Sequence, residues 1–555
     1  MKQAIRNRVI HWGLKLRSGW HWRSLRRAAN HPQQAQWQVL QPIVTQNQST
    51  TFGRAHQFAT INSIDSFRTQ VPIQTYASLQ PYIVRQRDAK ESALTQEAPV
   101  LYAQTSGTTG EPKYIPMTLS ALNSLKKQQQ IVAYHFLQAC PQAFDGDALA
   151  IVSPAIEGYF DSGVPYGSAS GCIHDTMPHW VREKFVIPPS VFAIKDYDLK
   201  YRIILCLALA HRNITYIACA NPSTLVRLMT LANEQLGQLI TCIETGDITA
   251  LGVIDDVVKK DITAKLIPSP GRAQQLKRLM GKSIRTLTDM WPELRLISTW
   301  TAGSCGVALS HITHQLPETV KVMDIGYLAS ELRSTVTVDS KTQSGLPLVN
   351  DHFYEFVEEQ AWEQGQQATL LLHQLQLGKS YYVIVTTNAG LYRYFMNDLI
   401  TVTGYYHETP LIKFLQKGKG VTSITGEKLY ESQLLDAMDC VMVEKNLSTV
   451  FVMGLADPET HHYQVFIETR QRPSCSLHEV AGLLDNALRD RNLEYDTKRA
   501  SGRLHHLETY WLREGAYEAY KRFCMQQGQR EGQFKLIALQ YRQNFPFSFD
   551  QWIQY

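Results

Sequence analysis

The stretch Tyr102-Ala-Gln-Thr-Ser-Gly-Thr-Thr-Gly-Glu-Pro-Lys113 decides the fold of this chain. It follows the apolar pair Val100-Leu101, so we expect it to form the turn after a short strand. Hydroxyl groups and glycines run through it and a lysine ends it: Thr105, Ser106, Gly107, Thr108, Thr109, Gly110 and Lys113. Glycines let backbone N–H groups form an anion-binding nest, hydroxyls add donors, and lysine supplies positive charge for outer phosphates. The stretch therefore indicates a polyphosphate-binding loop.

The loop differs from the G-x-x-x-x-G-K-[ST] loop that caps a helix. Glu111 and Pro112 separate its second glycine from the lysine. Tyr114-Ile-Pro116 is predicted to continue extended, because the residue before a proline is kept out of the helical region. The alternative interpretation is a Ser/Thr/Gly-rich surface turn that binds nothing, and the length and order of the residue types argue against it.

Three motifs give the chain a family resemblance. The loop resembles the phosphate loop of adenylate-forming enzymes, and more specifically that of the auxin-responsive Gretchen Hagen family of acyl-acid amido synthetases. Ile325-Gly-Tyr-Leu-Ala-Ser-Glu331 is similar to the second motif of that family, and Leu391-Tyr-Arg-Tyr394 with Asn397-Asp398 is similar to the third. All three occur in family order. Each motif departs from the plant form, which argues against auxin or jasmonate as the substrate and favours a microbial relative.

The resemblance implies an α/β fold with two domains. A large N-terminal adenylate-forming domain with mixed sheets and flanking helices would span residues 1–417, and a small mobile α+β lid would span 418–555. The implied protein is an ATP- and Mg²⁺-dependent ligase. It would adenylate a carboxylic acid, release pyrophosphate and transfer the acyl group to an amine, an amino acid, to form an amide and AMP. An acyl-CoA synthetase with the same adenylate chemistry and a catalytically inactive nucleotide-binding scaffold are the alternatives.

The resemblance also implies roles for single residues. The loop residues and Lys113 would hold the triphosphate, and Glu331 is a hard oxygen ligand suited to Mg²⁺. The adenosine moiety would be bound by Gly303, Ser304, Tyr327, Ser330, Arg393 and Asp398. The catalytic lysine would be Lys535, in Gly532-Gln-Phe-Lys535, with Lys428 as the second candidate. If the family resemblance is set aside, the same residues have other interpretations. Glu331 could balance a helix dipole, Tyr327 could be a core aromatic and Asn397-Asp398 could be a plain turn.

Hydrophobic patterning predicts where the sites lie. Compact apolar runs at 148–153, 214–219, 294–300 and 320–325 alternate with helical segments, a pattern typical of an open α/β sheet. Thr301-Ala-Gly-Ser-Cys-Gly306 and the second motif both follow such strands, where α/β sheets bind ligands. The Gly- and Lys-containing segment 415–430 is a candidate hinge, followed by a predicted strand at 448–453 and a helix at 477–489.

Composition limits the classes of protein. A chain of 555 residues with 44% hydrophobic and 19% charged residues is globular and too long for one core. The longest apolar run, 203–210, has eight residues, far below the ~18–20 of a membrane span. The nine cysteines are scattered without a C-x-x-C pair, which predicts a reducing, cytoplasmic location without a zinc site.

Residues 1–60 form a basic segment that is predicted to be helical, with breaks at Pro32 and Pro42. Nine basic residues and no acidic residue precede Asp65. Ile5, Val9, Trp12, Leu16 and Trp20 share one side of the first predicted helix. Peripheral membrane contact through residues 1–27, an organellar transit peptide, and a helix docked on the main body by this stripe are the interpretations, and docking is preferred. Nucleic-acid binding is disfavoured, because the basic stretch is short and the rest of the chain is net acidic.

Overall fold

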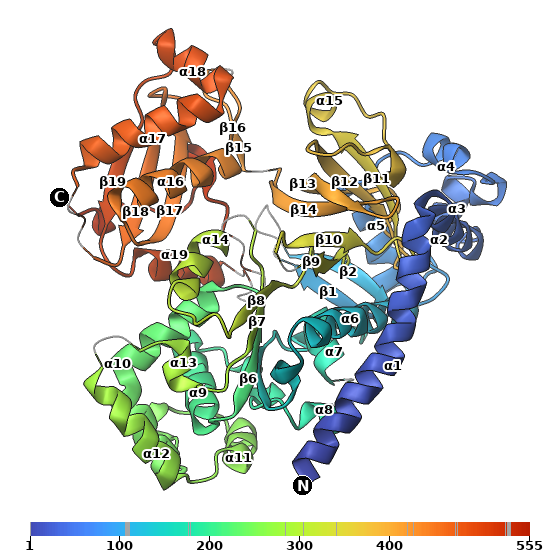
Figure 1. Ribbon diagram of the computed structural model, residues 1–555. Coiled ribbons are helices and arrows are strands. Elements are labelled where there is room, and N and C mark those ends of the chain that lie inside the picture. Colours follow the sequence, from blue (N-terminus) through green and yellow to red (C-terminus); the bar gives the residue numbers. More distant parts are fainter. Residues whose placement is uncertain are drawn as a thin grey trace. The chain divides into compact units, whose positions relative to one another are not determined.

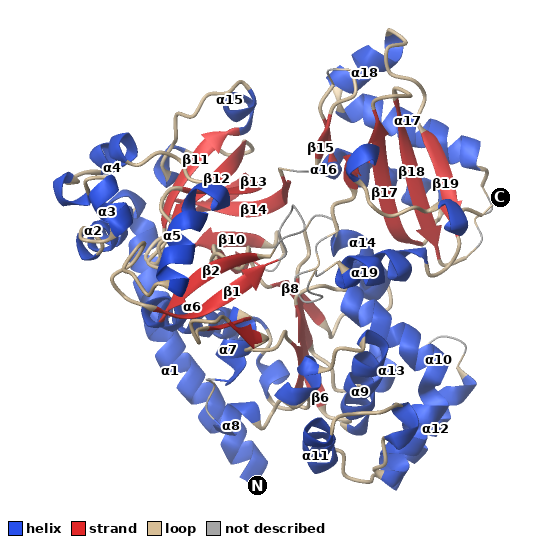
Figure 2. Ribbon diagram, turned by 180° about the vertical axis from the view of Figure 1, so that it is seen from behind, coloured by secondary structure: helices blue, strands red, loops and turns tan. Residues whose placement is uncertain are grey.

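The structure is a computed structural model that describes residues 2–105, 112–175, 177, 179–282, 285–302, 305–339, 341–418, 420–425, 427–471, 473, 475–527, 529, 534 and 536–554 (Figures 1 and 2). Contacts divide the chain into two compact units. Unit 1 comprises Met1–Trp300, Gln315–Met396 and Thr401–Lys413, and unit 2 comprises Thr301–His314, Asn397–Ile400 and Phe414–Tyr555. The described residues form five sheets with helices between them, so the predicted mixed α/β class is confirmed. The division predicted at residue 417 stays a prediction.

The N-terminal part of unit 1 is helical: α1 (Lys2–Asn30), α2 (Pro32–Gln46), α3 (Thr51–Ala55), α4 (Ile64–Gln70) and α5 (Tyr76–Asp88). Pro32 stands in the first turn of α2, where its missing N–H costs nothing. The break predicted at Pro42 is wrong, because Pro42 lies inside α2. Pro42 deprives the carbonyl of Gln38 of its helical partner, and both residues are exposed, so water can replace that bond. Burial of Leu40 and Val44 on the other side keeps the helix continuous.

Helix α1 docks on the neighbouring helix α6 (Leu119–Ala139), and Figure 1 shows the two helices side by side. The docking side carries Ser18, Leu25 and Ala29, which are at most 1% exposed. The predicted docking of α1 on the main body is observed, but Leu16 and Trp20 of the predicted stripe take no part in it, because they remain 55% and 66% exposed.

The first sheet holds the predicted phosphate loop. Its strands are ordered β2-β1-β5-β4, with bounds β1 (Pro99–Thr105), β2 (Lys113–Thr118), β4 (Gly158–Tyr159) and β5 (Pro165–Gly167). Strands β1 and β2 are antiparallel, and Thr105 pairs with Lys113 at the end of the ladder. Helix α6 begins directly after β2, and the Thr118 side chain caps it by accepting the Ala121 N–H. The chain after the loop is thus extended, as predicted.

The second sheet is parallel, with strand order β3-β6-β7-β8: β3 (Asp147–Ile151), β6 (Ile214–Cys219), β7 (Leu296–Thr299) and β8 (Lys321–Asp324). These four strands confirm the four predicted apolar runs. The helices between β3 and β8 are α7 (Ala169–Asp175), α8 (His179–Arg182), α9 (Tyr197–Ala210), α10 (Ser223–Thr245), α11 (Asp256–Lys265), α12 (Pro270–Lys277), α13 (Leu287–Met290) and α14 (Cys305–Thr313). In both views α9 and α10 lie on one side of this sheet (Figures 1 and 2).

The third sheet carries the Tyr-Arg motif. Its strand order is β11-β12-β13-β14-β10-β9, with bounds β9 (Thr335–Asp339), β10 (Ser344–Pro347), β11 (Phe353–Glu358), β12 (Ser380–Thr386), β13 (Tyr394–Tyr406) and β14 (Thr409–Lys417). The short helix α15 (Glu359–Glu363) follows β11.

The main sheet of unit 2 has four strands and is covered by helices on both faces. The sheet, ordered β19-β18-β17-β20, and its companions are β15 (Val421–Thr422), β16 (Leu429–Tyr430), α16 (Glu431–Lys445), β17 (Thr449–Asp457), β18 (His462–Thr469), α17 (Leu477–Arg491), α18 (Leu493–Ala500), β19 (Glu508–Leu512), α19 (Ala516–Gln526) and β20 (Leu539–Tyr541). Val452 and Ala456 of β17 pack in one core with residues of α16 and α17, whereas Phe451 and Met453 pack in another core with residues of α19. This alternation is the two-residue period of a strand covered on both faces. The predicted strand at 448–453 and helix at 477–489 are confirmed.

No helix in the described ranges is long and apolar enough to cross a membrane.

Candidate active site

The phosphate loop is a hairpin connection. Its base is the pair Thr105 and Lys113, which end β1 and begin β2. The Nζ atom of Lys113 lies 5.5 Å from the centre of the Tyr76 ring, within cation–π range. The Tyr76 hydroxyl accepts the Tyr114 N–H at 2.9 Å. Tyr76 therefore anchors the strand that carries the lysine. The predicted phosphate ligands Ser106, Gly107, Thr108, Thr109 and Gly110 lie outside the described residues.

The segment that ends at Tyr76 connects the loop to the Tyr-Arg motif. The Gln74 N–H donates to the Arg393 carbonyl at 2.9 Å, and the Phe395 N–H donates to the Gln74 carbonyl at 2.8 Å. Gln74 therefore pairs with Tyr394, the first residue of β13, in an isolated parallel β-bridge. Two residues later Tyr76 begins α5 and contacts β2. The first and third sequence motifs are joined by this short connection.

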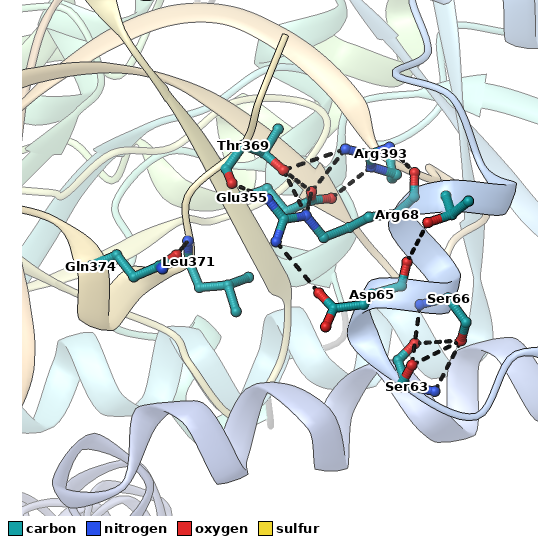
Figure 3. Close-up of polar contacts among 10 residues, drawn as sticks. Ser63, Asp65, Ser66, Arg68, Glu355, Thr369, Leu371, Gln374 and Arg393 are labelled. Carbon is teal, nitrogen blue, oxygen red and sulfur yellow. Dashed lines mark hydrogen bonds and ion pairs between the residues drawn. The ribbon is translucent and has the colours of Figure 1, made fainter.

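Arg393 is a structural residue in the described conformation. Its Nε and Nη2 donate to the two carboxylate oxygens of Glu355, each at 2.9 Å (Figure 3). Its Nη1 donates to the carbonyls of Arg68 and Val71 at 2.8 and 2.6 Å. A longer contact of 3.4 Å joins Nη2 to the Thr369 hydroxyl. All five N–H donors of this guanidinium are therefore occupied. The side chain has no donor left for a nucleotide, and we assign it a positioning role.

The second motif forms a tight turn after β8. Gly326 has a φ of +85°, its N–H donates to the Asp324 carboxylate at 2.7 Å, and a Cβ there would lie 2.6 Å from the Thr335 carbonyl oxygen. Only glycine fits this conformation at this close approach. The Tyr327 N–H donates to the Thr335 hydroxyl at 2.9 Å, and the Tyr327 carbonyl accepts the Ser334 N–H at 2.8 Å. The two arms of the turn are thus tied together.

The Ser-Glu pair stands at the tip of this turn. Leu328 and Arg333 form an antiparallel bridge, and the Ala329 N–H donates to the Leu332 carbonyl at 2.9 Å. Ser330 and Glu331 are the two residues between them, and both are partly exposed. The turn thus presents the carboxylate of Glu331 where a ligand can approach it.

Arg333 attaches the turn to α6. Its guanidinium donates to the Ile325 carbonyl at 2.7 Å and to the Gln129 side-chain oxygen at 2.9 Å. Arg333 is 4% exposed, and burial lowers its pKa to about 10, so it remains charged at neutral pH. Because α6 begins where the Lys113 strand ends, one helix supports both the first and the second motif.

The remaining predicted adenosine ligands are buried or outside the described residues. Tyr327 is 6% exposed and Asp398 is 0% exposed, and both have polar or ring contacts within the protein. Contacts of Tyr327 with adenine and of Asp398 with ribose stay predictions. Gly303 and Ser304 lie outside the described residues.

Lys428 of unit 2 follows a buried carboxylate. Glu427 is 0% exposed and accepts the N–H groups of Ile424 and Thr425, each at 2.8 Å, and the Tyr463 hydroxyl at 2.8 Å. Hydrogen bonds from several donors to one carboxylate are strong, so they hold the surrounding backbone in one conformation. The Glu427 side chain therefore fixes the turn from which the partly exposed Lys428 extends.

Lys535 lies outside the described residues, but a residue on either side of it in the sequence is buried or hydrogen-bonded to the core. Phe534 is 2% exposed, and the Ala538 N–H donates to the Glu431 carboxylate at 2.7 Å. Burial raises the pKa of Glu431 to about 7. The chain on both sides of Lys535 is thus attached to the core of unit 2.

The donor chemistry at Glu331 suits Mg²⁺. Within the described ranges no group of three or more His, Cys, Asp and Glu side chains is placed to hold a metal ion. Mg²⁺ that bridges phosphates takes only one or two protein carboxylates, so a single accessible glutamate is a sufficient protein contribution.

Comparison with protein families identifies the chain. The N-terminal domain model of the GH3 family matches residues 22–320, the central domain model matches 345–417, and the C-terminal domain model matches 432–543. The chain belongs to the GH3 family. The resemblance carried by the three sequence motifs is confirmed.

GH3 relatives match this chain over most of its length. The probable indole-3-acetic acid-amido synthetase GH3.11 of Oryza sativa subsp. japonica is 23% identical over 541 residues, which cover 90% of each chain. The 4-substituted benzoates-glutamate ligase GH3.12 of Arabidopsis thaliana is 22% identical over 537 residues, which cover 90% of this chain and 91% of the relative. These relatives are plant proteins, and the expectation of a microbial source stays a prediction.

Solved structures agree on the fold. The GH3.15 acyl acid amido synthetase matches with a TM-score of 0.83 at 19% identity, covering 95% of both chains. A 2-hydroxyisobutyryl-CoA ligase in complex with 2-HIB-AMP matches with a TM-score of 0.52 at 12% identity, covering 94% of this chain and 90% of the other. The GH3 chain therefore has the fold of adenylate-forming ligases.

The sequence did not reveal the residues that support the GH3 motifs. Tyr76, Arg333, Glu355 and Glu427 carry out this support, and none stands within a recognisable local pattern of its own. Arg333 and Glu427 adjoin motif residues, so only their place beside Glu331 and Lys428 could have suggested a role.

Proposed function

We propose that this protein is an ATP-dependent acyl-acid amido synthetase. It adenylates a carboxylic acid and transfers the acyl group to an amine, an amino acid, forming an amide. In the first step a carboxylate oxygen attacks the α-phosphorus of ATP and pyrophosphate leaves. In the second step the amine nitrogen attacks the acyl carbon, loses a proton, and AMP leaves.

One observation carries this proposal. Three GH3 domains occur in order, and unit 1 holds the Lys113 hairpin, the Glu331 turn and the Tyr-Arg strand in a connected framework through Tyr76 and Arg333. The amido synthetase and amino-acid ligase names of the plant relatives support the choice of reaction.

The described residues suit the electrostatic task. A carboxylate must approach an α-phosphate that is already negative, so the site has to supply positive charge and fixed geometry. We assign Lys113 to the triphosphate, because it stands at the base of a loop rich in hydroxyl donors. Glu331 would hold Mg²⁺, which would neutralise phosphate charge when bound. Lys428 and Lys535, both in unit 2, are assigned to the charge that develops on the α-phosphate.

An acyl-CoA synthetase is the second candidate, because the fold is also that of a 2-hydroxyisobutyryl-CoA ligase. The adenylation step is common to both reactions, and only the acceptor differs. The lower TM-score of that match and the GH3 domain order favour an amine as the acceptor.

The decisive experiment measures pyrophosphate release from ATP and Mg²⁺ with a panel of carboxylic acids that includes indole-3-acetate and substituted benzoates. Acid-dependent release that is lost in Glu331→Ala supports adenylation and names the acyl substrate. Glu318→Ala is the matched control, because Glu318 is an exposed carboxylate of the same unit and has no assigned role.

The acceptor is then found by mass spectrometry of products formed with amino acids or with coenzyme A. An amide confirms the proposal, and a thioester with no amide favours the second candidate. ATP binding without acid-dependent release from any acid would favour the inactive scaffold.

A further inference from the structure

Helix α1 presents a mixed apolar and basic stripe on its free side. Leu16, Trp20, Arg23 and Arg27 are spaced four, three and four residues apart, so they lie on one face of the helix. Leu16 is 55% exposed and Trp20 is 66% exposed, and the two arginines are exposed as well. Two large apolar side chains therefore stand together in water beside two cations.

The opposite side of α1 is already used. Ser18, Leu25 and Ala29 are buried, and the Trp22 ring packs edge-on against His135 of α6 at 4.3 Å between ring centres. Trp22 thus fulfils the docking role that the fold needs from this helix. Nothing in the packing of α1 requires Leu16 or Trp20 to be apolar.

Helix α1 and the helices α2 and α6 that contact it are together basic. Helices α1, α2 and α6 together contain ten basic and no acidic residues. The pKa of His21 is lowered by burial first and then by the nearby cations Lys127 and Arg17. A basic helix with tryptophan and leucine on its free face has the composition of helices that lie in the interface of anionic bilayers.

We propose that the stripe formed by Leu16, Trp20, Arg23 and Arg27 binds the surface of an anionic lipid membrane. The tryptophan and leucine enter the headgroup region while the arginines bind lipid phosphates and carboxylates. A second copy of the chain and nucleic acid could also cover such a stripe. The lipid surface is favoured because a second copy would bring ten like charges against ten, and because nucleic acid offers no apolar region for two adjacent large side chains.

The test is co-sedimentation of the full-length protein with lipid vesicles. One set contains phosphatidylcholine alone, and in the other about a third of the lipid is phosphatidylserine. We expect binding to the anionic vesicles only. The double variant Arg23→Gln/Arg27→Gln should bind about 25-fold more weakly, because each basic residue near an anionic surface contributes about a fivefold factor. Leu16→Gln/Trp20→Gln should abolish sedimentation without changing the net charge.

Helix α11 supplies matched controls. Val253 and Val257 are 96% and 70% exposed apolar residues in or next to this helix, and Lys259 and Lys260 are exposed basic residues on it. Val253→Gln/Val257→Gln and Lys259→Gln/Lys260→Gln should bind like the wild type. Circular dichroism confirms that all variants fold.

Three results would overturn the proposal. The first is equal binding to both vesicle compositions, or none to either. The second is equal loss in the α11 and α1 variants. The third is that the vesicles are not bound, while the wild type, but not the stripe variants, forms a dimer in light scattering or binds a DNA or RNA duplex.

Discussion

Replacing Glu355 by Gln is expected to destabilise unit 1 strongly, because two arginines share this carboxylate. Arg393 pairs with it through two bonds of 2.9 Å, and the Arg68 Nε lies 3.4 Å from Oε1 (Figure 3). The side chains of Glu355 and Arg393 are only 1% and 6% exposed, so water cannot take the place of the lost charge. Glutamine has nearly the same volume and retains one acceptor oxygen, so the variant tests the charge rather than the packing.

The expected magnitude follows from burial. Breaking a buried ion pair by removing one partner costs about 3–5 kcal/mol, because the other charge stays in a region of low polarity. Here the remaining charges are two arginines close together. Asp65 offsets part of the charge of Arg68, at 3.8 Å, but Asp65 is 93% exposed and its effect is small. A loss toward the upper end of this range is therefore expected.

Hydrogen exchange measured by mass spectrometry suits a chain with two units, whose global unfolding need not be two-state. Amide protection in β11 and β12 should fall by about a thousandfold or more, since each factor of ten corresponds to about 1.4 kcal/mol. Glu358→Gln is the matched control. Glu358 ends the same strand and pairs with Lys379 at 3.1 Å, but the two side chains are 37% and 44% exposed. Loss of this surface pair should cost at most about 1 kcal/mol.

Equal protection in the two variants would refute the reasoning. It would show that the Glu355 site is hydrated, or that the arginines find other anions when the carboxylate is removed.

Three further predictions concern the turns and the buried carboxylates. Gly326→Ala should lower acid-dependent pyrophosphate release by about a hundredfold, because the new Cβ would meet the Thr335 carbonyl at 2.6 Å and displace the Glu331 turn by about 1 Å. Glu427→Gln should lower kcat about tenfold with little change in KM for ATP, because the loosened turn holds Lys428 in its working position less of the time. Unit 2 should lose stability as the pH rises from about 4.5 to about 7, because the pKa of Glu431 is raised from 4.5 to about 7 and the folded protein keeps its proton where the unfolded chain has lost it. In urea unfolding, the free energy of unfolding of Glu431→Gln should fall less over this pH range than that of the wild type, by at most about 3 kcal/mol.

Each of these has its own contradicting outcome. For Gly326, normal release in the alanine variant would mean that the turn adapts without moving the carboxylate. For Glu427, the double variant Glu427→Gln/Lys428→Ala should be no slower than Lys428→Ala alone. Additive losses in the double variant would show that Glu427 does not act through Lys428. For Glu431, an unchanged pH slope would assign the dependence to Glu468, whose pKa burial also raises to about 7.

The sequence was most informative where local patterns are strong. The four parallel strands are short runs of buried apolar residues, and each could be located because burial on both faces removes polar residues from the run. The second motif follows a predicted strand, and its single glycine, Gly326, has a conformation that other residues avoid.

Contacts between distant residues could not be predicted in this way. The motif places Arg393 at the nucleotide site, where it could steady the site or pair with Asp398, whereas its contact with Glu355, 38 residues earlier, has no pattern in the sequence that connects the two residues. The docking side of α1 was misjudged because amphipathic periodicity identifies an apolar stripe but not the surface that it meets. The buried side of α1 carries Ser18, Leu25 and Ala29 instead.

The pairing of Thr105 with Lys113 limits how this protein can be re-engineered or can diverge. Successive residues of a strand point to opposite faces, so an insertion or deletion that shifted β2 by one residue against β1 would turn the lysine to the other face of the sheet. Such a shift would also move the buried Ile115 and Met117 out of their present packing. Libraries that vary the loop should therefore change the residue types and keep the length, and natural variants of the loop should differ in length only rarely.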